Sequence, residues 1–535
     1  MLCAFNAAAD DAVQATPMAP SRMVPVAGRS FDIEEIDVDG NSLLSDIDIQ
    51  AVLSTFTGPE RRAEDVDAAR GALEKLYHDL GYQTVEVVIP KQTLKDGVVL
   101  LEVHERSVGR LTISGSKYSS IDAVKSEIPS LAEGQVPDFG DLQKDLVYAN
   151  RDPARRVTAS SLRPGAAPGT VDVVMDVDDK LPLHASAEIN NRYSNSTGHQ
   201  RAVFTAGYDN LFQMRHSFSA SMQIIPGHDD QGRVYTASYI APLGDGSWSL
   251  MASGLENSSH VAALVGTDVA GSGHSLGLKL VRQIPDPNGQ VFSTLSFGID
   301  YKRFDTVTTT STATTPFSQA TPITYWPLTL GYSRNSSVRG APWQTDLSLM
   351  FASAQLGSDN STVDLSRYGA RGDMFSLRGS SSWAVKLPVG FELGLRGNAQ
   401  FTDRPLINSE QMSIGGADTV RGYLESEGLG DYGFGTSMEL RAPSIPDLFA
   451  SSKFASVLTE FQPYLFTDAA WVRVRGPFPD SSTPHGFELS SYGAGATLRM
   501  REYLYAGLNY ARTLRKGPYT PEGNNRFLFR ISASF

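Results

Sequence analysis

Apolar and polar residues alternate along this chain with two different periods, and the change between them comes near residue 180. Before that point, strand-like alternation is interleaved with segments whose apolar residues recur three and four positions apart, as in an amphipathic helix. After it, short alternating segments follow one another, separated by Gly, Asn, Asp, Ser and Pro. The pattern predicts helices and strands up to about residue 180 and strands alone from there on.

The region before residue 180 repeats one order of elements, which is strand, helix, helix, strand, strand. The first copy opens with FDIEEIDVDGN and continues with SDIDIQAVLSTF, for which Ser45 or Asp46 is the expected N-cap. Its second helix closes at Gly81, a residue type common just after a helix. That helix has apolar residues at helical spacing, namely Val66, Ala69, Leu73, Leu76, Tyr77 and Leu80. The strands TVEVVIP and GVVLLEV complete this copy.

The second copy has the same order of elements with different residues. It runs from VGRLTISGS through IDAVKSEIPSL and a helix around Leu142 and Leu146 to the strands RVTASSLRP and GTVDVVMDV. Self-similarity of this kind indicates an internal repeat. We therefore predict two small α+β units, at residues 31–105 and 106–180.

Residues 181–535 contain sixteen alternating segments. Their cores read HASAEIN, AVFTAGYDN, HSFSASMQI, VYTASYIAP, WSLMASGLE, SLGLKLV, FSTLSFGIDY, ITYWPLTLGY, TDLSLMFAS, FSLRGSSSWAVKL, FELGLRGNAQF, GTSMELRAP, PYLFTDAAWV, YGAGATLRM, LYAGLNYA and RFLFRISASF. Gly, Ser and Ala dominate one face of many of them, and large apolar residues the other, as in a transmembrane barrel. A soluble sandwich would alternate similarly, but closure into a barrel also removes the sheet edges that so many strands create. We predict an antiparallel sixteen-stranded transmembrane β-barrel.

The last segment, FLFRISASF, places five apolar residues on one face at period two. These are Phe527, Phe529, Ile531, Ala533 and Phe535. On a soluble protein such a face would expose apolar surface, whereas in a barrel it points into lipid. A terminal strand buried in a soluble domain remains the alternative.

Composition excludes several classes of function. The formal net charge of −13 and a pI near 5.2 argue against nucleic acid as the main partner. Cys3 is the single cysteine, so neither a disulfide framework nor a cysteine metal site is expected. No apolar run reaches the ~18 residues of a membrane-spanning helix. The nine histidines show no paired metal spacing, and no phosphate-binding loop is present. We predict no catalytic residue, no metal, no cofactor and no enzyme activity.

Two short motifs suggest other functions but fit strands or loops better. Gly273-His274-Ser275-Leu276-Gly277 matches the nucleophile elbow of esterases, which requires a strand–turn–helix context. A strand and a turn follow it here, so alternation on a lumen-facing strand explains it. The tripeptide at residues 371–373, Arg-Gly-Asp, fits a loop-to-strand transition.

Residues 1–30 are expected to form a leader or linker. The start MLCAFNAAADD has no basic residue before its acidic pair, so it fits either the end of a truncated signal peptide or a disordered cytosolic leader. Pro17, Pro20 and Pro25 favour a linker over a helix.

One glycine-rich loop and one strand contain the most specific motifs of the chain. The stretch GGADTVRGY lies between the eleventh and twelfth predicted strands and contains Val420, Arg421, Gly422 and Tyr423. On the thirteenth strand, FTDAA contains a second motif, made of Phe466, Asp468 and Ala470. Together with the tandem units and the barrel, these motifs resemble the TpsB transporters of two-partner secretion, of the haemolysin secretion/activation type within the BamA-like superfamily. VRGY is similar to the signature of that superfamily's sixth extracellular loop.

The resemblance is not complete at the second motif. It is similar to the family pattern F-x-D-x-G, but Ala470 stands where the pattern has glycine. LRPGAAPGTVDVVMDV and INNRYSN also resemble the end of the second POTRA unit and the first barrel strand of that family. The resemblance covers nearly the whole chain from about residue 31.

The resemblance implies a fold, a location and partners. The two α+β units would be periplasmic POTRA repeats, and the barrel would lie in the lipid of the bacterial outer membrane. The implied function is translocation of an unfolded, TpsA-like secreted exoprotein through the barrel lumen. Barrel assembly machinery would recognise the C-terminal strand ending at Phe535. Alternatives are an assembly factor of the same superfamily, which usually has more POTRA units, and a passive porin or barrel enzyme.

The alternation of residues suggests a partner for Arg421. On the thirteenth strand Asp468 shares the inward face with Phe466 and Ala470, while the opposite face is lipid-like. If the loop at residues 402–431 folds into the lumen, Arg421 and Asp468 can form a two-pronged ion pair that ties it to the wall. A solvated surface loop whose arginine has no fixed partner is the alternative.

We also expect the exoprotein to be captured by strand addition. It would add to an exposed strand of a POTRA unit, at residues 84–90 or 157–162.

Overall fold

The computed structural model describes residues 30–535 except 151–153, 196, 228–231, 259–260, 265–266, 271, 287–289, 313–314, 337–340, 446–457, 477–483 and 502. The leader predicted at residues 1–30 therefore lies, except for Ser30, outside the described residues. The chain divides into two compact units, each described below by itself. The first comprises the described residues within 1–115, 124–150 and 157–177, and the second comprises the remainder.

The first unit begins with a small sheet covered by two helices. In this sheet β2 runs parallel to β5, and β4 runs antiparallel to β5 at the other side, in the order β2-β5-β4. The short strands β1 and β3 pair with each other in a separate two-stranded antiparallel sheet. The elements are β1 (Phe31–Ile33), β2 (Glu35–Asp39), α1 (Asp46–Leu53), η1 (Ser54–Phe56), β3 (Gly58–Arg61), α2 (Ala63–Asp79), β4 (Glu86–Val88) and β5 (Val98–His104).

The helices α1 and α2, which accompany this sheet, form where the residue pattern predicts them. Ser45 caps α1, because its side chain accepts a hydrogen bond from the backbone N–H of Asp48 at 3.3 Å. In α2, Leu73 and Tyr77 are fully buried, whereas Leu80 falls just after the last turn and is 49% exposed. Gly81 has φ +103°, the left-handed conformation that ends a helix without steric cost.

The first alternating segment is not one strand, as predicted, but two. The backbone N–H groups of Glu34 and Glu35 both point to the carbonyl oxygen of Gly97, at 2.8 and 3.4 Å. The chain therefore changes its partner at this point, from β3 to β5. The segment TVEVVIP likewise contributes only the three residues of β4 to the sheet.

A second sheet of the same kind follows, in the order β6-β8-β7, with β6 parallel to β8. Its core is apolar and includes Val124 from α3, Leu142 from α4 and Met175 from β8. β7 forms one edge of the sheet. The elements are β6 (Ser107–Ser114), α3 (Ile121–Ser126), η2 (Pro129–Leu131), α4 (Phe139–Ala149), β7 (Arg155–Pro164) and β8 (Thr170–Asp179).

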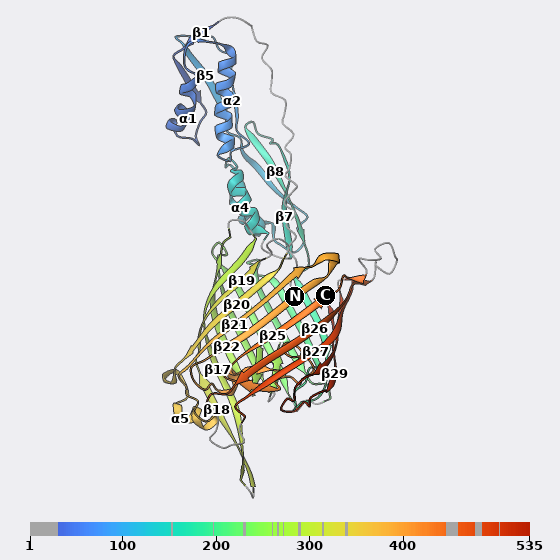
Figure 1. Ribbon diagram of the computed structural model, residues 1–535. Helices are drawn as coiled ribbons and strands as arrows, with labels where there is room; N and C mark the ends of the chain where they lie inside the picture. The colour runs from blue at the N-terminus through green and yellow to red at the C-terminus, as the bar shows by residue number, and fades with distance from the viewer. Residues whose placement is uncertain are drawn as a thin grey trace. The chain divides into compact units, whose positions relative to one another are not determined.

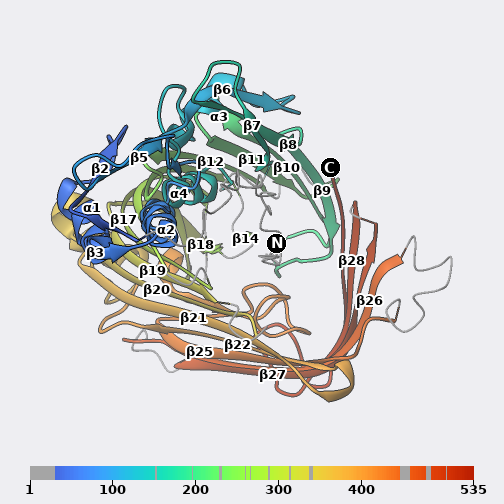
Figure 2. The same ribbon diagram turned by 90° about the horizontal axis from the view of Figure 1, so that it is seen from above.

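The second unit is a closed antiparallel barrel, which confirms the predicted fold class (Figure 1; Figure 2). β18 and β19 follow each other in the chain and both pair with β17, so we count them as one interrupted strand. Counted in this way, the barrel has sixteen strands. The strands are β9 (Leu183–Asn190), β10 (Arg201–Leu211), β11 (His216–Ile224), β12 (Arg233–Leu243), β13 (Trp248–Asn257), β16 (Ser272–Ile284), β17 (Val291–Thr312), β18 (Thr315–Tyr325), β19 (Leu328–Ser336), β20 (Trp343–Ala352), β21 (Met374–Lys386), β22 (Glu392–Phe401), β25 (Tyr432–Arg441), β26 (Leu458–Arg473), β27 (Gly486–Met500), β28 (Leu504–Thr513) and β29 (Asn525–Ser534).

Side chains of the barrel alternate between an exposed apolar face and a buried or polar inner face. On β29, Phe527 and Ile531 are exposed, and Arg526 and Leu528 on the opposite face are buried. β29 closes the barrel by pairing with β9 from Arg530 to Ser534. Among the described residues, no helix is long and apolar enough to cross a membrane.

The eighth predicted strand, ITYWPLTLGY, is interrupted at Pro327. This residue lacks a backbone N–H and cannot continue the ladder, so β18 ends at Tyr325 and β19 begins at Leu328. β17 pairs with both pieces, and its pairing with β18 continues to Thr312. The resulting β17–β18 hairpin continues past the last pair that β17 makes with β16, at Asp305, an extension that alternation alone did not predict.

The remaining elements lie in the connections between barrel strands. They are β14 (Val261–Leu264), β15 (Thr267–Ala270), η4 (Ala354–Leu356), α5 (Asn360–Ser366), η5 (Pro388–Gly390), η6 (Asn408–Glu410), β23 (Met412–Ile414) and β24 (Gly428–Gly430). The esterase-like motif at residues 273–277 lies within β16, without the turn and helix a nucleophile elbow needs. The Arg-Gly-Asp tripeptide immediately precedes β21. Most of INNRYSN lies after β9, in the connection to β10.

Candidate functional site

The connection between β22 and β25, residues 402–431, folds into the barrel and is called the lumen loop below. Its stem is a short hairpin in which Met412 pairs with Gly430 and Ile414 with Gly428. In Figure 2 this orange segment lies inside the ring of strands. Val420 and Tyr423, at the tip of the hairpin, are fully buried. A surface loop in free solvent is therefore excluded.

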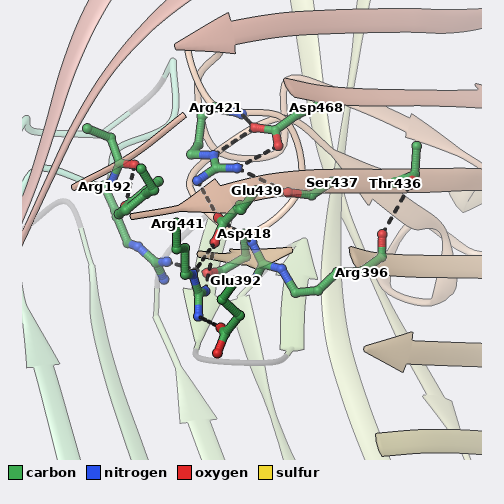
Figure 3. Close-up of polar contacts among 12 residues, drawn as sticks. Arg192, Glu392, Arg396, Asp418, Arg421, Thr436, Ser437, Glu439, Arg441 and Asp468 are labelled. Atoms are coloured by element: carbon green, nitrogen blue, oxygen red, sulfur yellow. Dashed lines mark hydrogen bonds and ion pairs between the residues drawn. The ribbon is translucent and has the colours of Figure 1, made fainter. Parts of the chain in front are cut away.

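Arg421, at the tip of the lumen loop, forms a two-pronged ion pair with Asp468 on β26 (Figure 3). Its Nε atom donates to Oδ2 at 2.8 Å and its Nη2 atom to Oδ1 at 2.7 Å. Its backbone N–H adds a third bond to Oδ2 at 3.0 Å. The Arg421 side chain is 4% exposed and that of Asp468 1%, so both charges are removed from bulk water. Such charge-assisted bonds are short and directional.

Asp468 points inward because side chains alternate along β26. Asp468 and Phe466 are buried, whereas Leu465 and Trp471 on the other face are 62% and 40% exposed. The register with β25 places Ser437 opposite Asp468 and Glu439 opposite Phe466. The residues of two neighbouring strands therefore surround one guanidinium.

β25 supplies two further acceptors to Arg421. Its Nη1 atom donates to Oε1 of Glu439 at 2.7 Å, and Nη2 also donates to the Ser437 hydroxyl at 3.0 Å (Figure 3). Glu439 in turn accepts from Arg441, at 2.7 Å. Two carboxylates thus face Arg421, and Arg441 offsets part of the second negative charge.

Phe466 and Ala470 complete the wall around the tip. The Cζ atom of Arg421 lies 3.5 Å from the Phe466 ring centroid, which is a cation–π contact. Ala470 is buried in an apolar cluster with Val420, Tyr423 and Leu489. The methyl group that distinguishes it from the family glycine is therefore accommodated by packing.

The two other residues of the VRGY motif also contact the barrel wall. Gly422 has φ +100°, and a Cβ atom there would lie 3.3 Å from the Ala511 side chain and 3.2 Å from that of Thr513. The Tyr423 hydroxyl donates to the carbonyl oxygen of Arg515 at 2.6 Å. The structure thus brings together all seven residues singled out from the sequence, and each contacts the loop tip or the wall beside it.

Glu410 is a contact of the lumen loop that the sequence analysis missed. It is 1% exposed and accepts from Lys302 at 2.8 Å, the Tyr325 hydroxyl at 2.6 Å and Arg378 at 2.7 Å. These groups lie on β17, β18 and β21, on strands other than those that bind Arg421. A lone acidic residue in a loop carries no local signal for such distant partners.

Glu427 binds a second connection of the barrel. Its carboxylate accepts from the backbone N–H groups of Tyr519 and Thr520 at 2.8 and 2.6 Å and from the Thr520 hydroxyl at 2.8 Å.

The sequence analysis also missed Ser437 and Glu439, although both fall on the inward face of β25 by period two. That alternation, read beside the motif on β26, is the signal that could have found them.

A cavity of about 750 Å³ lies beside the lumen loop. It is lined by Glu410 and Asp418 of the loop and by wall residues such as Ser238, Asp300 and Asn398. Small hydroxyl side chains on the wall pair with each other, as Ser219 does with Ser238 at 2.8 Å. No cluster of three or more potential metal ligands occurs in the described part of the chain.

Comparisons with known proteins agree with this architecture. Residues 169–498 match the family described as haemolysin secretion/activation protein ShlB/FhaC/HecB, and residues 31–105 match the ShlB-type POTRA domain. The outer membrane transporter CdiB of Dickeya dadantii (strain 3937) is 26% identical over 227 residues, which cover 42% of this chain and 39% of that protein. CdiB-2 of Burkholderia pseudomallei (strain 1026b) is 25% identical over 167 residues, which cover 31% of this chain and 28% of that protein. The chain thus matches less than half the length of these curated relatives.

Solved structures share the fold over nearly the whole chain. CdiB from Escherichia coli has a TM-score of 0.60 at 17% identity, covering 97% of this chain and 93% of that one. BamA from Haemophilus ducreyi, lacking POTRA domains 1–3, has a TM-score of 0.58 at 14% identity, covering 94% and 100%. The family match extends over more than half of the chain, which confirms the resemblance found in the sequence. The chain therefore belongs to the haemolysin secretion/activation (ShlB/FhaC/HecB) family, whose members are outer-membrane β-barrel transporters with periplasmic POTRA domains.

Proposed function

We propose that this protein translocates an unfolded partner exoprotein across the bacterial outer membrane, through the lumen of its barrel. The observation that carries the proposal is the lumen loop, which is held inside the barrel by buried ion pairs to the wall. A segment fixed in this way fills part of the lumen at rest, and its displacement would widen the lumen for an extended chain.

In this proposal the pair of Arg421 and Asp468 keeps the loop in its resting position. Removing one member of a desolvated ion pair typically costs ~3–5 kcal/mol, because the other charge stays buried without its partner. A barrel closed by hydrogen bonds around its whole circumference does not depend on one such pair. The pair therefore controls the position of the loop and not the integrity of the fold.

The two α+β sheets would capture the exoprotein by adding one of its strands to an exposed edge. We propose β7 for this role in preference to β4. At β4, the N–H of Val87 points to the Glu74 carboxylate at 3.4 Å, and the carbonyl of Val87 lies 3.5 Å from Nη1 of Arg70. Side chains of α2 thus occupy the backbone groups that an added strand would need.

The edge of β7 (Arg155–Pro164) is partly covered by a side chain. Val157 exchanges two hydrogen bonds with the Asn150 side chain, at 2.6 and 2.9 Å. Backbone groups alternate in direction along a strand, so those of Ala159 and Ser161 point to the same side as those of Val157. This part of the edge is available to an extended chain.

The organisation proposed for the chain follows from these roles. Residues 31–105 and 106–180 would be two POTRA units, residues 181–535 the barrel, and residues 1–30 a leader. The exoprotein is the partner in translocation, and lipid surrounds the apolar outer face of the barrel. Barrel assembly machinery would bind the C-terminal strand that ends at Phe535.

The test is secretion in a host that lacks both partners. The chain is produced together with a candidate TpsA-like exoprotein, and exoprotein in the medium is measured. We expect secretion with the full chain and none after deletion of residues 31–105, while the barrel stays folded, as judged by its heat-modifiable migration. Exoprotein that stays in the periplasm with the full chain present would overturn the proposal. A fall in the amounts of other outer-membrane barrels on depletion of the chain would instead favour an assembly factor.

A further inference from the structure

Asp431, the last residue of the lumen loop, has a set of contacts separate from the tip. Its side chain is fully buried and forms a two-pronged ion pair with Arg367, whose Nη1 and Nη2 atoms lie 2.6 Å from Oδ1 and Oδ2. Arg367 lies directly after α5, in the connection between β20 and β21. A different connection of the barrel therefore supplies the cation that pairs with the base of the loop.

The same carboxylate joins both ends of the lumen loop. Oδ1 accepts from the backbone N–H of Leu406 at 2.9 Å, and Oδ2 accepts from that of Arg475 at 2.7 Å. Arg367 also donates to the Leu406 carbonyl oxygen. Arg475, which follows β26, donates from Nε to the carbonyl oxygen of Thr402 at 2.9 Å. Two connections thus hold the beginning and the end of the loop at one point.

Apolar side chains also pack at the base of the loop. Leu406 and Ile407 are buried in one cluster with Val363 of α5 and Ala370, from the connection after α5. Each of these four side chains is no more than 2% exposed. The connection between β20 and β21 therefore contacts the loop base through both charge and apolar surface.

We propose that Arg367 and Asp431 form an outer anchor that positions the lumen loop at its base. The loop then has two fixed points. At the tip, Arg421 of the loop binds residues of β25 and β26, and at the base, Asp431 of the loop binds Arg367. Release of the tip alone lets the hairpin of β23 and β24 turn about its base while remaining attached there. The role of the anchor in translocation rests on the proposed function, but its effect on loop position does not.

Channel recordings of the purified full-length protein in planar bilayers test this proposal without any exoprotein. Arg367→Ala should raise the ratio of open to closed time by a factor of at least about five, the effect of losing one modest interaction. Asp431→Asn keeps the size of the side chain, removes its charge and should raise the ratio as well. Arg367→Lys should lie between wild type and Arg367→Ala, since an ammonium cannot reproduce the two-pronged contact.

A matched control comes from the same connection. Arg371 is exposed and forms no ion pair with any residue that the structure describes. Arg371→Ala should therefore record as wild type. Because the tip and the base share no partner among the described residues, the effects of Arg367→Ala and Arg421→Ala on the logarithm of the ratio should add in the double variant.

Each possible result either supports or overturns the outer anchor. Folded variants at Arg367 and Asp431 that both record as wild type would overturn the outer anchor, and so would an equal effect of Arg371→Ala. Heat-modifiable migration shows which variants are folded, and Asp431→Asn serves if Arg367→Ala does not insert. Altered recordings without secretion by the wild-type protein would keep the anchor and remove the proposed function.

Discussion

The guanidinium of Arg421 lies over the ring of Phe466, with its Cζ atom 3.5 Å from the ring centroid. The same group donates to both oxygens of Asp468, two residues further along the strand. Both partners are on the inward face of β26, because that face repeats every second residue. One strand thus offers a flat apolar surface and a two-pronged acceptor to a single planar cation.

Phe466→Leu should weaken the hold on the loop tip less than loss of the carboxylate does. A desolvated cation–π contact contributes about 2 kcal/mol, whereas the charge of Asp468 is opposed by a buried guanidinium. We expect channels that open more often than in wild type but less often than in Asp468→Ala. Phe434→Leu, on the exposed face of β25, is the control and should record as wild type. A larger effect of Phe466→Leu than of Asp468→Ala would contradict this order.

A double-mutant cycle measures the pairing of Arg421 with Asp468. Arg421→Ala and Asp468→Ala should each insert normally and secrete poorly, and their defects should overlap instead of adding, because each removes the same ion pair. Glu439 remains as a second acceptor for Arg421, so the defect of Asp468→Ala should be the smaller of the two. Arg421→Lys should also fail, since an ammonium is not planar. A coupling energy of zero would mean that the two residues act independently.

The sequence was sufficient to predict the barrel and the inward direction of Asp468, because both follow from a period of two residues. It was not sufficient for the contacts of Glu410 and Asp431. Each is an acidic residue in a loop, and its partners lie on strands or connections far away in the chain. Folding of the lumen loop into the barrel brings these groups together, and no local sequence pattern predicts that folding. The division of the first strand at Glu34 was missed for the same reason, since the acceptor is Gly97.

Glu410→Gln should loosen the lumen loop from the strands that do not bind Arg421. The substitution keeps the size of the side chain but removes the charge that faces Lys302 and Arg378. We expect more frequent or larger openings in planar bilayers than in wild type, and deletion of residues 402–431 should give a large and steady pore. Glu522→Gln, on an exposed residue, should have no effect. A wild-type conductance already as large as that of the deletion would contradict the role of the loop.

Ser161→Pro should reduce secretion if β7 captures the exoprotein. Proline removes the N–H that would pair with an added strand, and it is tolerated at a sheet edge because no internal hydrogen bond is lost. Ser161→Ala keeps the N–H and should secrete as wild type, which separates the backbone from the hydroxyl. The measurement is exoprotein in the medium at equal amounts of folded barrel. Equal secretion by the proline and alanine variants would remove β7 as the capture edge.

Asp179, at the end of β8, should hold the segment of residues 117–119 down to acid pH. Its carboxylate accepts from the backbone N–H groups of Lys117 and Tyr118, each at 2.8 Å, and of Ser119 at 2.7 Å. Burial by itself raises the pKa of Asp179, but these hydrogen bonds outweigh it and the pKa is lowered. The stabilisation is therefore present above the ordinary aspartate pKa of ~3.9 and is lost only as the pH falls through the lower folded value.

Hydrogen exchange of the three amides, corrected for intrinsic rates, measures this contribution. Asp179→Asn should speed their exchange at neutral pH, because a neutral amide accepts more weakly than a carboxylate, whose hydrogen bonds contribute ~1.5–3 kcal/mol each. Asp178→Asn, at the exposed neighbouring residue, should leave their exchange unchanged. The difference between wild type and Asp179→Asn should persist at pH ~4 and disappear only in stronger acid, because the wild-type carboxyl group stays ionised below the ordinary aspartate range. A difference that is already gone well above pH ~4 would mean that the three N–H groups do not hold the charged form of Asp179.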